Sequence, residues 1–527
     1  MQKVINFRCL KNLGVLRANI KYWPIFLLLL LTFFLRIYKL EELFYFTYDE
    51  SIPAFVGRRL ILFNHIPLIG GVTPFGFHLT PYFYWSLSTI LALGNFNPIA
   101  WGWTGALFAM FTTIFMYIVG TAFANKRAGL TAAIFWTFSY LANIYDRHLW
   151  ALYPGPLLSL IVVYSLYKIK KGSENFVFLL SIAIIVGISS DPSNFVFVLL
   201  TIIAWIFFKI PFKKSTLAGI FIIIFSFLPL IVFDLRHSFA NTRPFFAFWQ
   251  SGNNNPQIEF SNFSENTLIF PRALVRLIYP FGDNEIAKQY SYCASFIQEK
   301  YQSLPTLLVL SSLILLILFI TWSLKSTKET GWKLVAILII LYYLGLQLYG
   351  TVFQADIFEH YITGLFTAFL LIFAKLVSVF PKKIWLLILA IFVSANLYKL
   401  SLAKNSHGLA YKRQAIEFVL KSIGDNDFSL ESHSTCWKLS GYRYLFAVFG
   451  REPVKSYVDS NFGYLYGSTP IAPDHPKTVV AIVTHDFVPE TDEFYKKYAI
   501  FKSHEVKNGL FGNIEVVIMD NSKNWFK

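Results

Sequence analysis

The chain of 527 residues is 55% hydrophobic and 19% aromatic, and only 14% of its residues are charged. A soluble protein carries roughly 25% charged residues, so this composition, with a mean hydropathy of +0.52, excludes an ordinary soluble enzyme and favours many membrane spans. The formal net charge of +16 does not indicate a nucleic-acid partner, because the basic residues form short clusters between apolar runs and no continuous stripe.

The first predicted element is a membrane span over residues 22–40. The apolar run ends at Arg36 and Lys39 without a small-residue cleavage site, so we expect it to stay uncleaved. Basic residues precede the run, which predicts a cytoplasmic N-terminus because basic flanks stay on that side. These residues are Lys3, Arg8, Lys11, Arg17 and Lys21.

Further apolar stretches bring the predicted number of transmembrane helices to about eleven, since a span needs about 20 apolar residues. They are 98–123, 128–145, 149–167, 175–190, 192–208, 216–234, 303–324, 332–352, 361–379 and 383–399.

The apolar stretch 81–96 is ambiguous, and the positions of the charges decide how we interpret it. If it does not cross, every short basic loop is cytoplasmic; if it crosses, all of these loops are turned outward. We therefore predict an outer interfacial or re-entrant helix, which also suits its aromatic start at Tyr82, Phe83, Tyr84 and Trp85.

Two long regions are predicted to lie outside the membrane. Residues 235–302 form a polar loop, and the C-terminal part alternates a helix-like stretch (410–423) with short apolar strands (479–483 and 515–519). The predicted fold class is an all-α polytopic membrane protein with outer interfacial helices and a small extracytoplasmic α/β domain. The predicted boundaries are 1–400 for the membrane domain and 401–527 for the C-terminal domain, in a plasma (inner) membrane.

The sharpest chemical feature is the acidic pair Asp49 and Glu50, directly after the first span. The same loop continues with Arg58 and Arg59 on the predicted outer side, against the positive-inside trend. An anionic ligand or lipid headgroup would explain two arginines there, because a guanidinium fork suits phosphate. A merely solvated loop is the plain alternative.

A second feature is Asp146-Arg147-His148, which joins two spans with almost no loop. Ionisable residues at such a depth are functional candidates, although a local Asp–Arg pair that closes a tight turn is the plain alternative. Two weaker clusters lie on the same predicted side, namely Asp234-Leu235-Arg236-His237 and Glu359-His360-Tyr361. Asp191, before Pro192, is predicted to cap a helix and to be structural.

The chain lacks the sequence motifs of several enzyme classes. It contains no Walker A loop, no GxGxxG motif before a helix, no GxSxG and no HExxH. ATP hydrolysis, nicotinamide chemistry and zinc proteolysis are therefore unsupported. Its cysteines, Cys9, Cys293 and Cys436, have no metal-site spacing.

An acidic pair after the first span, then 67–71, then a Pro-aromatic-Trp stretch at 79–85, resembles the first outer loop of the GT-C glycosyltransferases. The likeness is greatest to the bacterial relatives of the protein O-mannosyltransferase and aminoarabinose-transferase group, and it covers roughly residues 20–400. Asp146-Arg147 and Glu359-His360-Tyr361 resemble later outer elements of that family. Thr80-Pro81 departs from the Pro-Pro that is usual there.

This resemblance implies inverting transfer of a sugar from a polyprenyl-phosphate donor to a lipid, glycan or protein acceptor at the outer face. Asp49 is expected to be the base, with Glu50 orienting it or capping a helix. Asp146 is expected to hold the acceptor, fix an arginine or ligate a divalent cation, and the metal stays open. The cations expected to bind the donor phosphate, with Tyr361 beside them, are Arg58, Arg59, Arg147, Arg236, His237 and His360.

Other function classes stay open from the residues alone. A transporter or flippase of lipid-linked glycans would show ionisable residues inside several spans, whereas here they cluster at the predicted outer ends. An oligosaccharide ligase would transfer a whole glycan instead of one sugar. A scaffold acting through its C-terminal domain would leave Asp49, Glu50 and the arginine pair unexplained.

Overall fold

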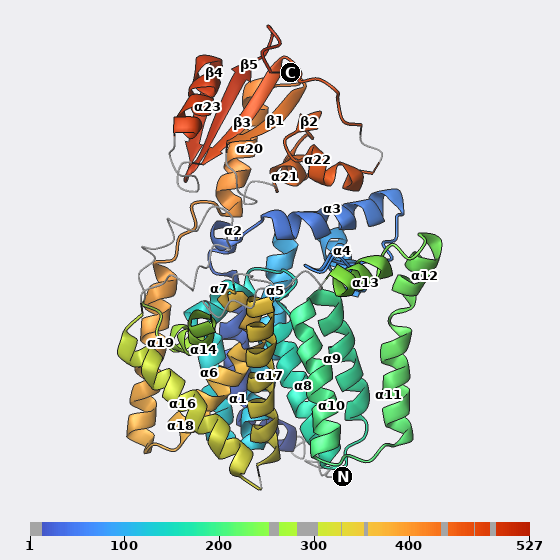
Figure 1. Ribbon diagram of the computed structural model, residues 1–527. Coiled ribbons are helices and arrows are strands. Elements are labelled where there is room, and N and C mark those ends of the chain that lie inside the picture. Colours follow the sequence, from blue (N-terminus) through green and yellow to red (C-terminus); the bar gives the residue numbers. More distant parts are fainter. Residues whose placement is uncertain are drawn as a thin grey trace, which may run out of the picture.

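A computed structural model of the chain describes residues 13–251, 263–281, 304–327, 329–352, 357–433, 441–467, 470–484 and 492–526. A body of roughly parallel helices occupies one end of the molecule, and a β-sheet with its own helices lies at the other (Figure 1). Helix α3 (Tyr48–Phe63) runs across the boundary between these two layers, nearly perpendicular to the bundle.

Each of the predicted apolar stretches contains a helix. Six helical segments of the described residues are long and apolar enough to cross a membrane, with shorter apolar helices beside them. The protein is therefore an integral membrane protein. The number of about eleven transmembrane helices remains a prediction. The body consists of α1 (Leu13–Ile37), α5 (Ile99–Phe123), α6 (Lys126–Phe138), α7 (Tyr140–Asp146), α8 (Gly155–Lys170), α9 (Phe176–Ser190), α10 (Val196–Phe207), α11 (Lys214–Phe225), α12 (Leu228–Arg236), α14 (Phe263–Ile278), α16 (Thr306–Lys325), α17 (Thr330–Val352), α18 (Phe366–Ser378) and α19 (Lys382–Ser401).

Helix α4 (Tyr82–Leu93) is the stretch that the charge pattern left outside the count of spans. Its 12 residues are about 18 Å long at 1.5 Å per residue, well short of the roughly 30 Å hydrocarbon core. It packs on α3 and α5. Its length therefore agrees with a helix that does not cross.

The prediction of a polar loop over 235–302 is wrong for part of that region. Helix α13 (Thr242–Ser251) follows α12, and α14 enters the bundle. The side chains of Ile269, Phe270 and Leu274 are buried in the main hydrophobic core. Their helical spacing carries one apolar face into the bundle, and the polar stretches around this segment hid that periodicity.

The C-terminal part forms a five-stranded sheet in the order β2-β1-β3-β5-β4. Strand β1 pairs in parallel with β2 and β3, whereas β5 is antiparallel to β3 and β4. The predicted apolar strands correspond to β3 and β5, and the predicted helix to α20. The elements are α20 (Leu409–Ile423), β1 (Phe428–His433), α21 (Tyr442–Phe449), β2 (Lys455–Ser456), α22 (Asp459–Phe462), η6 (Gly463–Leu465), β3 (Thr478–Thr484), α23 (Asp492–Ser503), β4 (Glu505–Phe511) and β5 (Ile514–Asp520).

One hydrophobic cluster joins this sheet to the helices around α3. Phe55 of α3 contacts the rings of Tyr444, Phe462 and Tyr466, with ring centroids 5.3, 6.0 and 5.1 Å apart. Burial of aromatic surface is the largest favourable contribution that such a contact offers. The C-terminal layer therefore fixes the position of α3, and with it Asp49 in the first turn of that helix.

Candidate functional site

A cavity of about 950 Å³ lies where the helical body meets the C-terminal layer. Its walls come from segments far apart in the sequence, at one end of the bundle. They are α3 from Asp49 to Arg59, the loop 64–79, Phe83 with Tyr84 at the start of α4, the turn 150–152, the turn 190–192, the end of α12 from Phe233 to His237, His360 with Tyr361 in η4 (Glu359–Leu365), and Tyr464 with Leu465.

The start of α3 positions Asp49. Thr47 is the N-cap residue, and the Glu50 carboxylate accepts hydrogen bonds from both the Thr47 backbone N–H and its hydroxyl, each at 2.8 Å. This is the reciprocal arm of a capping box, which satisfies a backbone donor that a helix start leaves unpaired. Glu50 is fully buried, whereas Asp49 is exposed to the cavity. Glu50 thus fixes the helix start, and Asp49 faces the space where a ligand would lie.

His148 holds the second oxygen of Glu50. Its Nδ1 lies 2.9 Å from Glu50 Oε1, and both side chains are buried. Burial by itself would raise the pKa of Glu50, but the His148 imidazole and the hydrogen bonds from Thr47 outweigh it and hold that pKa below its ordinary value. Glu50 is therefore a fixed negative charge beside Asp49.

Asp49 has the opposite electrostatic environment. Its side chain is accessible from the cavity, yet burial among protein atoms, followed by the negative charge of Glu50, raises the pKa of Asp49 to about 6. The Asp191 carboxylate adds to this rise, and His148 opposes it. A carboxylate with a pKa near the working pH is well matched to accept a proton and later release it.

Asp191 is a cavity residue that the sequence analysis treated as structural. It does cap η2 (Pro192–Phe195), because its Oδ1 accepts a hydrogen bond from the Ser193 backbone N–H at 2.8 Å. It also lines the cavity that Asp49 lines. Its place at the end of α9, on the same predicted side as Asp49, was the one signal that could have pointed to this second role.

Cations and aromatic rings complete the cavity wall. Arg59 lines it and donates from Nη1 to the Tyr464 carbonyl at 3.0 Å. Arg236 and His237, at the end of α12, are exposed and line the cavity. His360 and Tyr361 line it as well, and the ring centroids of His360 and Trp150 are 5.0 Å apart. Three of the four charged clusters predicted from the sequence thus contribute residues to the cavity wall. The fourth cluster, Asp146-Arg147-His148, does not line it.

Arg58 and Arg147, two of the predicted phosphate-binding residues, do not line the cavity. Arg58 forms an ion pair with Glu452 of the C-terminal layer. Arg147 is buried and donates to backbone carbonyls, including that of Tyr38 at 3.1 Å. Neither guanidinium group reaches the cavity, and both already have protein acceptors. They are therefore not placed to bind the phosphate of a lipid-linked donor.

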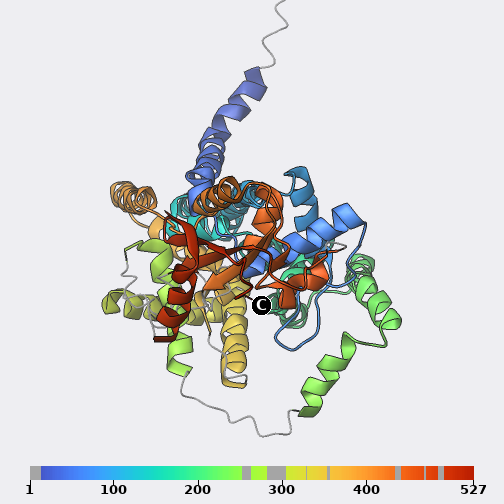
Figure 2. The same cartoon turned by 90° about the horizontal axis from the view of Figure 1, so that it is seen from above.

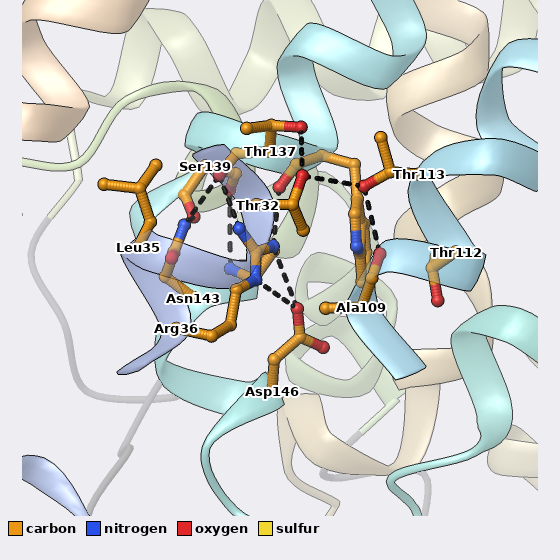
Figure 3. Close-up of polar contacts among 12 residues, drawn as sticks. Thr32, Leu35, Arg36, Ala109, Thr112, Thr113, Thr137, Ser139, Asn143 and Asp146 are labelled. Carbon is orange, nitrogen blue, oxygen red and sulfur yellow. Dashed lines mark hydrogen bonds and ion pairs between the residues drawn. The ribbon is translucent and has the colours of Figure 1, made fainter. Parts of the chain in front are cut away.

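Asp146 is also away from the cavity, in a buried polar cluster inside the bundle (Figure 3). Its Oδ2 accepts from the Nε of Arg36 at 2.9 Å, while the Arg36 Nη groups donate to the carbonyls of Thr137 and Trp136 at 2.5 and 2.9 Å. Of the predicted roles, fixing an arginine is the one that these contacts match. The arginine is Arg36 of the first span, and not the neighbouring Arg147.

A break in the predicted span 128–145 explains this cluster. Helix α6 ends at Phe138 and α7 starts at Tyr140, with Ser139 in a non-helical conformation between them. A helix end leaves backbone carbonyls without helical partners. Arg36 supplies donors for two of them, and Ser139 donates to the Leu277 carbonyl at 2.8 Å.

The described residues contain no group of three or more His, Cys, Asp or Glu side chains placed to hold a metal ion. At the cavity, Asp49 and Asp191 are the two carboxylates that a divalent cation would meet. Two oxygen ligands alone do not form an all-protein site for such an ion.

Comparison with solved structures finds proteins whose chains align with most of this chain. They include ArnT from Cupriavidus metallidurans bound to undecaprenyl phosphate, with a TM-score of 0.48 and 11% identity, covering 94% of this chain and 97% of that one. They also include the Archaeoglobus fulgidus oligosaccharyltransferase in complex with Zn and sulfate, with a TM-score of 0.45 and 11% identity, covering 86% of this chain and 67% of that one. No protein-family model and no curated protein matches the chain.

Proposed function

We propose that this protein is a membrane glycosyltransferase that moves a sugar from a polyprenyl-phosphate donor to an acceptor hydroxyl, with Asp49 as the base. The observation that carries the proposal is a carboxylate with a pKa of about 6 that is exposed to a cavity shared with Arg59 and Arg236. A base and cations that meet at the end of apolar helices suit a substrate that is lipid at one end and anionic at its reacting centre.

The proposed reaction is a single displacement. Asp49 accepts the proton of the acceptor hydroxyl while that oxygen forms a bond to the anomeric carbon of the donor sugar. The bond from this carbon to the phosphate oxygen breaks, and its electron pair leaves with the lipid phosphate. One displacement inverts the configuration at the anomeric carbon, and the proton on Asp49 passes to water afterwards. General-base catalysis of this kind contributes typically about 10²–10⁴-fold in rate.

The cavity cations act on the leaving group in this proposal. Negative charge grows on the phosphate as the glycosidic bond breaks, so a cation near it stabilises the transition state more than the ground state. Arg236 and His237 are the first candidates, because both line the cavity and both are exposed at the end of α12. Arg59 of α3 is partly committed to the Tyr464 carbonyl.

The pH dependence of transfer follows from Asp49. Because burial raises the pKa of Asp49 to about 6, Asp49 is protonated below that pH and is then too weak a base to accept the proton of the acceptor hydroxyl. We expect kcat/KM to fall about tenfold per pH unit below pH 6 and to level off above it. The measurement is initial rates in liposomes from about pH 5 to pH 8, with the residual rate of Asp49→Asn as the flat control. A wild-type rate that is constant between pH 5 and pH 7 would contradict the assignment.

Arg236 is expected to stabilise the negative charge on the donor phosphate during transfer. Arg236→Gln removes one positive charge from the cavity wall and should lower kcat/KM for the lipid-linked donor about tenfold, equivalent to about 1.4 kcal/mol of transition-state stabilisation. The matched control is Arg413→Gln, which loses a surface ion pair with Glu41 far from the cavity. Equal losses in the two variants would show that the effect is general and would remove Arg236 from the proposed site.

The function itself is tested with the purified full-length protein in lipid vesicles. Radiolabelled polyprenyl-phosphate hexoses and pentoses are supplied one at a time, with a mixture of lipid, glycan and peptide acceptors, and loss of label from the lipid fraction is followed. Turnover of one donor that depends on Asp49 supports the proposal and names the sugar. Movement of intact donor between leaflets without turnover would favour a transporter and overturn it.

A further inference from the structure

Helix α13 occupies an unusual place in the molecule. It runs across the bundle direction near the level where α9 and α10 end (Figure 1), and seen from above it projects from the periphery beside α11 and α12 (Figure 2). It begins six residues after α12, whose end closes the candidate span Lys214–Arg236. The helix therefore lies beside the end of a segment that is long and apolar enough to cross a membrane.

Exposed aromatic side chains gather on α13 and in the turn before it. Phe239 of the turn and Phe245 and Phe246 of the helix are 55, 42 and 57% exposed. We call these three residues the aromatic edge. Arg243, also exposed, lies among them in the sequence. Large exposed apolar side chains that gather in one place mark an interaction surface.

The loop 64–79 packs directly on α13 through its tip. The rings of Phe77 and Phe245 meet edge to face with centroids 5.9 Å apart, and Phe75 stacks on Phe77 at 6.0 Å. At Gly76, with a φ of +82°, the Cα lies so close to Pro244 that a Cβ atom would be 3.2 Å from the Pro244 Cβ. The loop tip and the helix thus form one continuous surface.

Hydrogen bonds also tie this surface to the cavity wall. The Asp234 carboxylate accepts from the Asn241 backbone N–H at 2.7 Å and from the Thr242 hydroxyl. The Asn241 side chain in turn accepts from the His78 N–H at 2.6 Å and donates to the His78 carbonyl at 3.3 Å. Asp234 is buried, and the two residues after His237 have left-handed backbones that this cluster supports. The aromatic edge, the loop and the end of α12 are therefore fixed to one another.

We propose that the aromatic edge lies in the headgroup region of the lipid leaflet on the cavity side of the membrane. Aromatic rings prefer the boundary between headgroups and acyl chains, and an arginine among them pairs with lipid phosphates. The edge adjoins the end of a candidate span and faces away from the protein, so lipid is the surface that its position offers. A second copy of the chain would need a matching apolar face at the same level.

This placement has a consequence for the cavity, which rests on the proposed function. Arg236 and His237 share the α12–α13 turn with the Asp234 cluster, so the aromatic edge sets their depth. With the edge at headgroup level, their side chains meet the phosphate of a lipid-linked donor that stays in the leaflet. The edge acts here as a positioning surface, and it touches no reacting atom.

The proposal is tested by depth measurement on the full-length protein in liposomes. Cys9, Cys293 and Cys436 are changed to serine, and a nitroxide is attached at position 246 in Phe246→Cys, or at 239 in Phe239→Cys should the first variant not fold. Collision rates with oxygen and with a water-soluble nickel chelate report depth. Tyr495→Cys, 48% exposed on α23, is the aqueous reference, and Leu318→Cys, 60% exposed on α16, is the hydrocarbon reference.

The expected result is an oxygen-to-nickel accessibility ratio at 246 between those of the two references. A ratio equal to that at 495 would place the edge in water and overturn the proposal. Low accessibility to both reagents would show burial against protein, such as a second copy, and would overturn it equally. Because the measurement needs no turnover, an immersed edge in an inactive protein would contradict only the proposed function, and an aqueous edge in an active enzyme only this inference.

Discussion

Replacing Asp49 by asparagine is expected to lower the rate of sugar transfer by about 10²–10⁴-fold, the range that loss of a general base produces. Asparagine keeps the shape of the side chain, so the cavity and the start of α3 should stay intact. The Glu50 carboxylate, which holds Thr47 at 2.8 Å, is unchanged in this variant. The loss should therefore appear in kcat and in kcat/KM together, because the interaction with the proton exists only in the transition state.

The measurement is transfer of label from the donor that the wild-type protein turns over, in vesicles of the same composition. Asp425→Asn is the matched control, because Asp425 is exposed in the C-terminal layer and the chemical change is the same. Folding is checked by elution as a single species in detergent. A folded Asp49→Asn protein that works at the wild-type rate would mean that another group accepts the proton.

The second large effect is expected on stability, at Arg36. Arg36→Met leaves Asp146 as a buried negative charge without its cation and leaves the carbonyls of Trp136 and Thr137 without these donors. Breaking a buried ion pair by removing one partner typically costs about 3–5 kcal/mol. We expect a correspondingly lower temperature of unfolding in detergent, with the cavity residues themselves unchanged.

A double variant separates the charge from the carbonyl contacts. Arg36→Met combined with Asp146→Leu removes both charges, so part of the loss should return, because two matched apolar groups can replace an ion pair at little cost. The Trp136 carbonyl at the end of α6 lacks its Arg36 donor in both variants, whereas the Thr137 carbonyl still accepts from the Asn143 side chain at 3.0 Å. If the double variant were as unstable as the sum of the single ones, the pair would contribute nothing by itself and the cluster in Figure 3 would act through the carbonyls alone.

The proposed site joins the two layers of the molecule. Asp49 belongs to a helix whose position depends on aromatic contacts with the C-terminal layer, such as that of Phe55 with Tyr466. Tyr464 of that layer lines the cavity and accepts a hydrogen bond from Arg59. The boundary predicted at residue 400 therefore separates two parts of the chain that share one hydrophobic cluster and one cavity wall.

The sequence by itself determined the membrane character and the positions of most helices. Apolar runs of about 20 residues leave a chain little choice but helices that satisfy their own backbone groups. Strands β3 and β5 could also be predicted from the sequence, because they are short apolar runs between polar segments. Asp49 and Glu50 could be predicted as site residues because acidic residues next to arginines at the end of a membrane span are unusual and typical of functional sites.

Only the tertiary structure decided which charges meet. Neighbours on a helix point about 100° apart, so Arg59 reaches the cavity while Arg58 turns to Glu452, and no sequence pattern separates the two. Asp146 pairs with Arg36, 110 positions away, because a break at Ser139 exposes carbonyls next to the first span. Asp191 lines the same cavity as Asp49 because α9 packs on α4, and α4 packs on α3. Side-chain direction and long-range packing set these contacts, and a linear pattern carries neither.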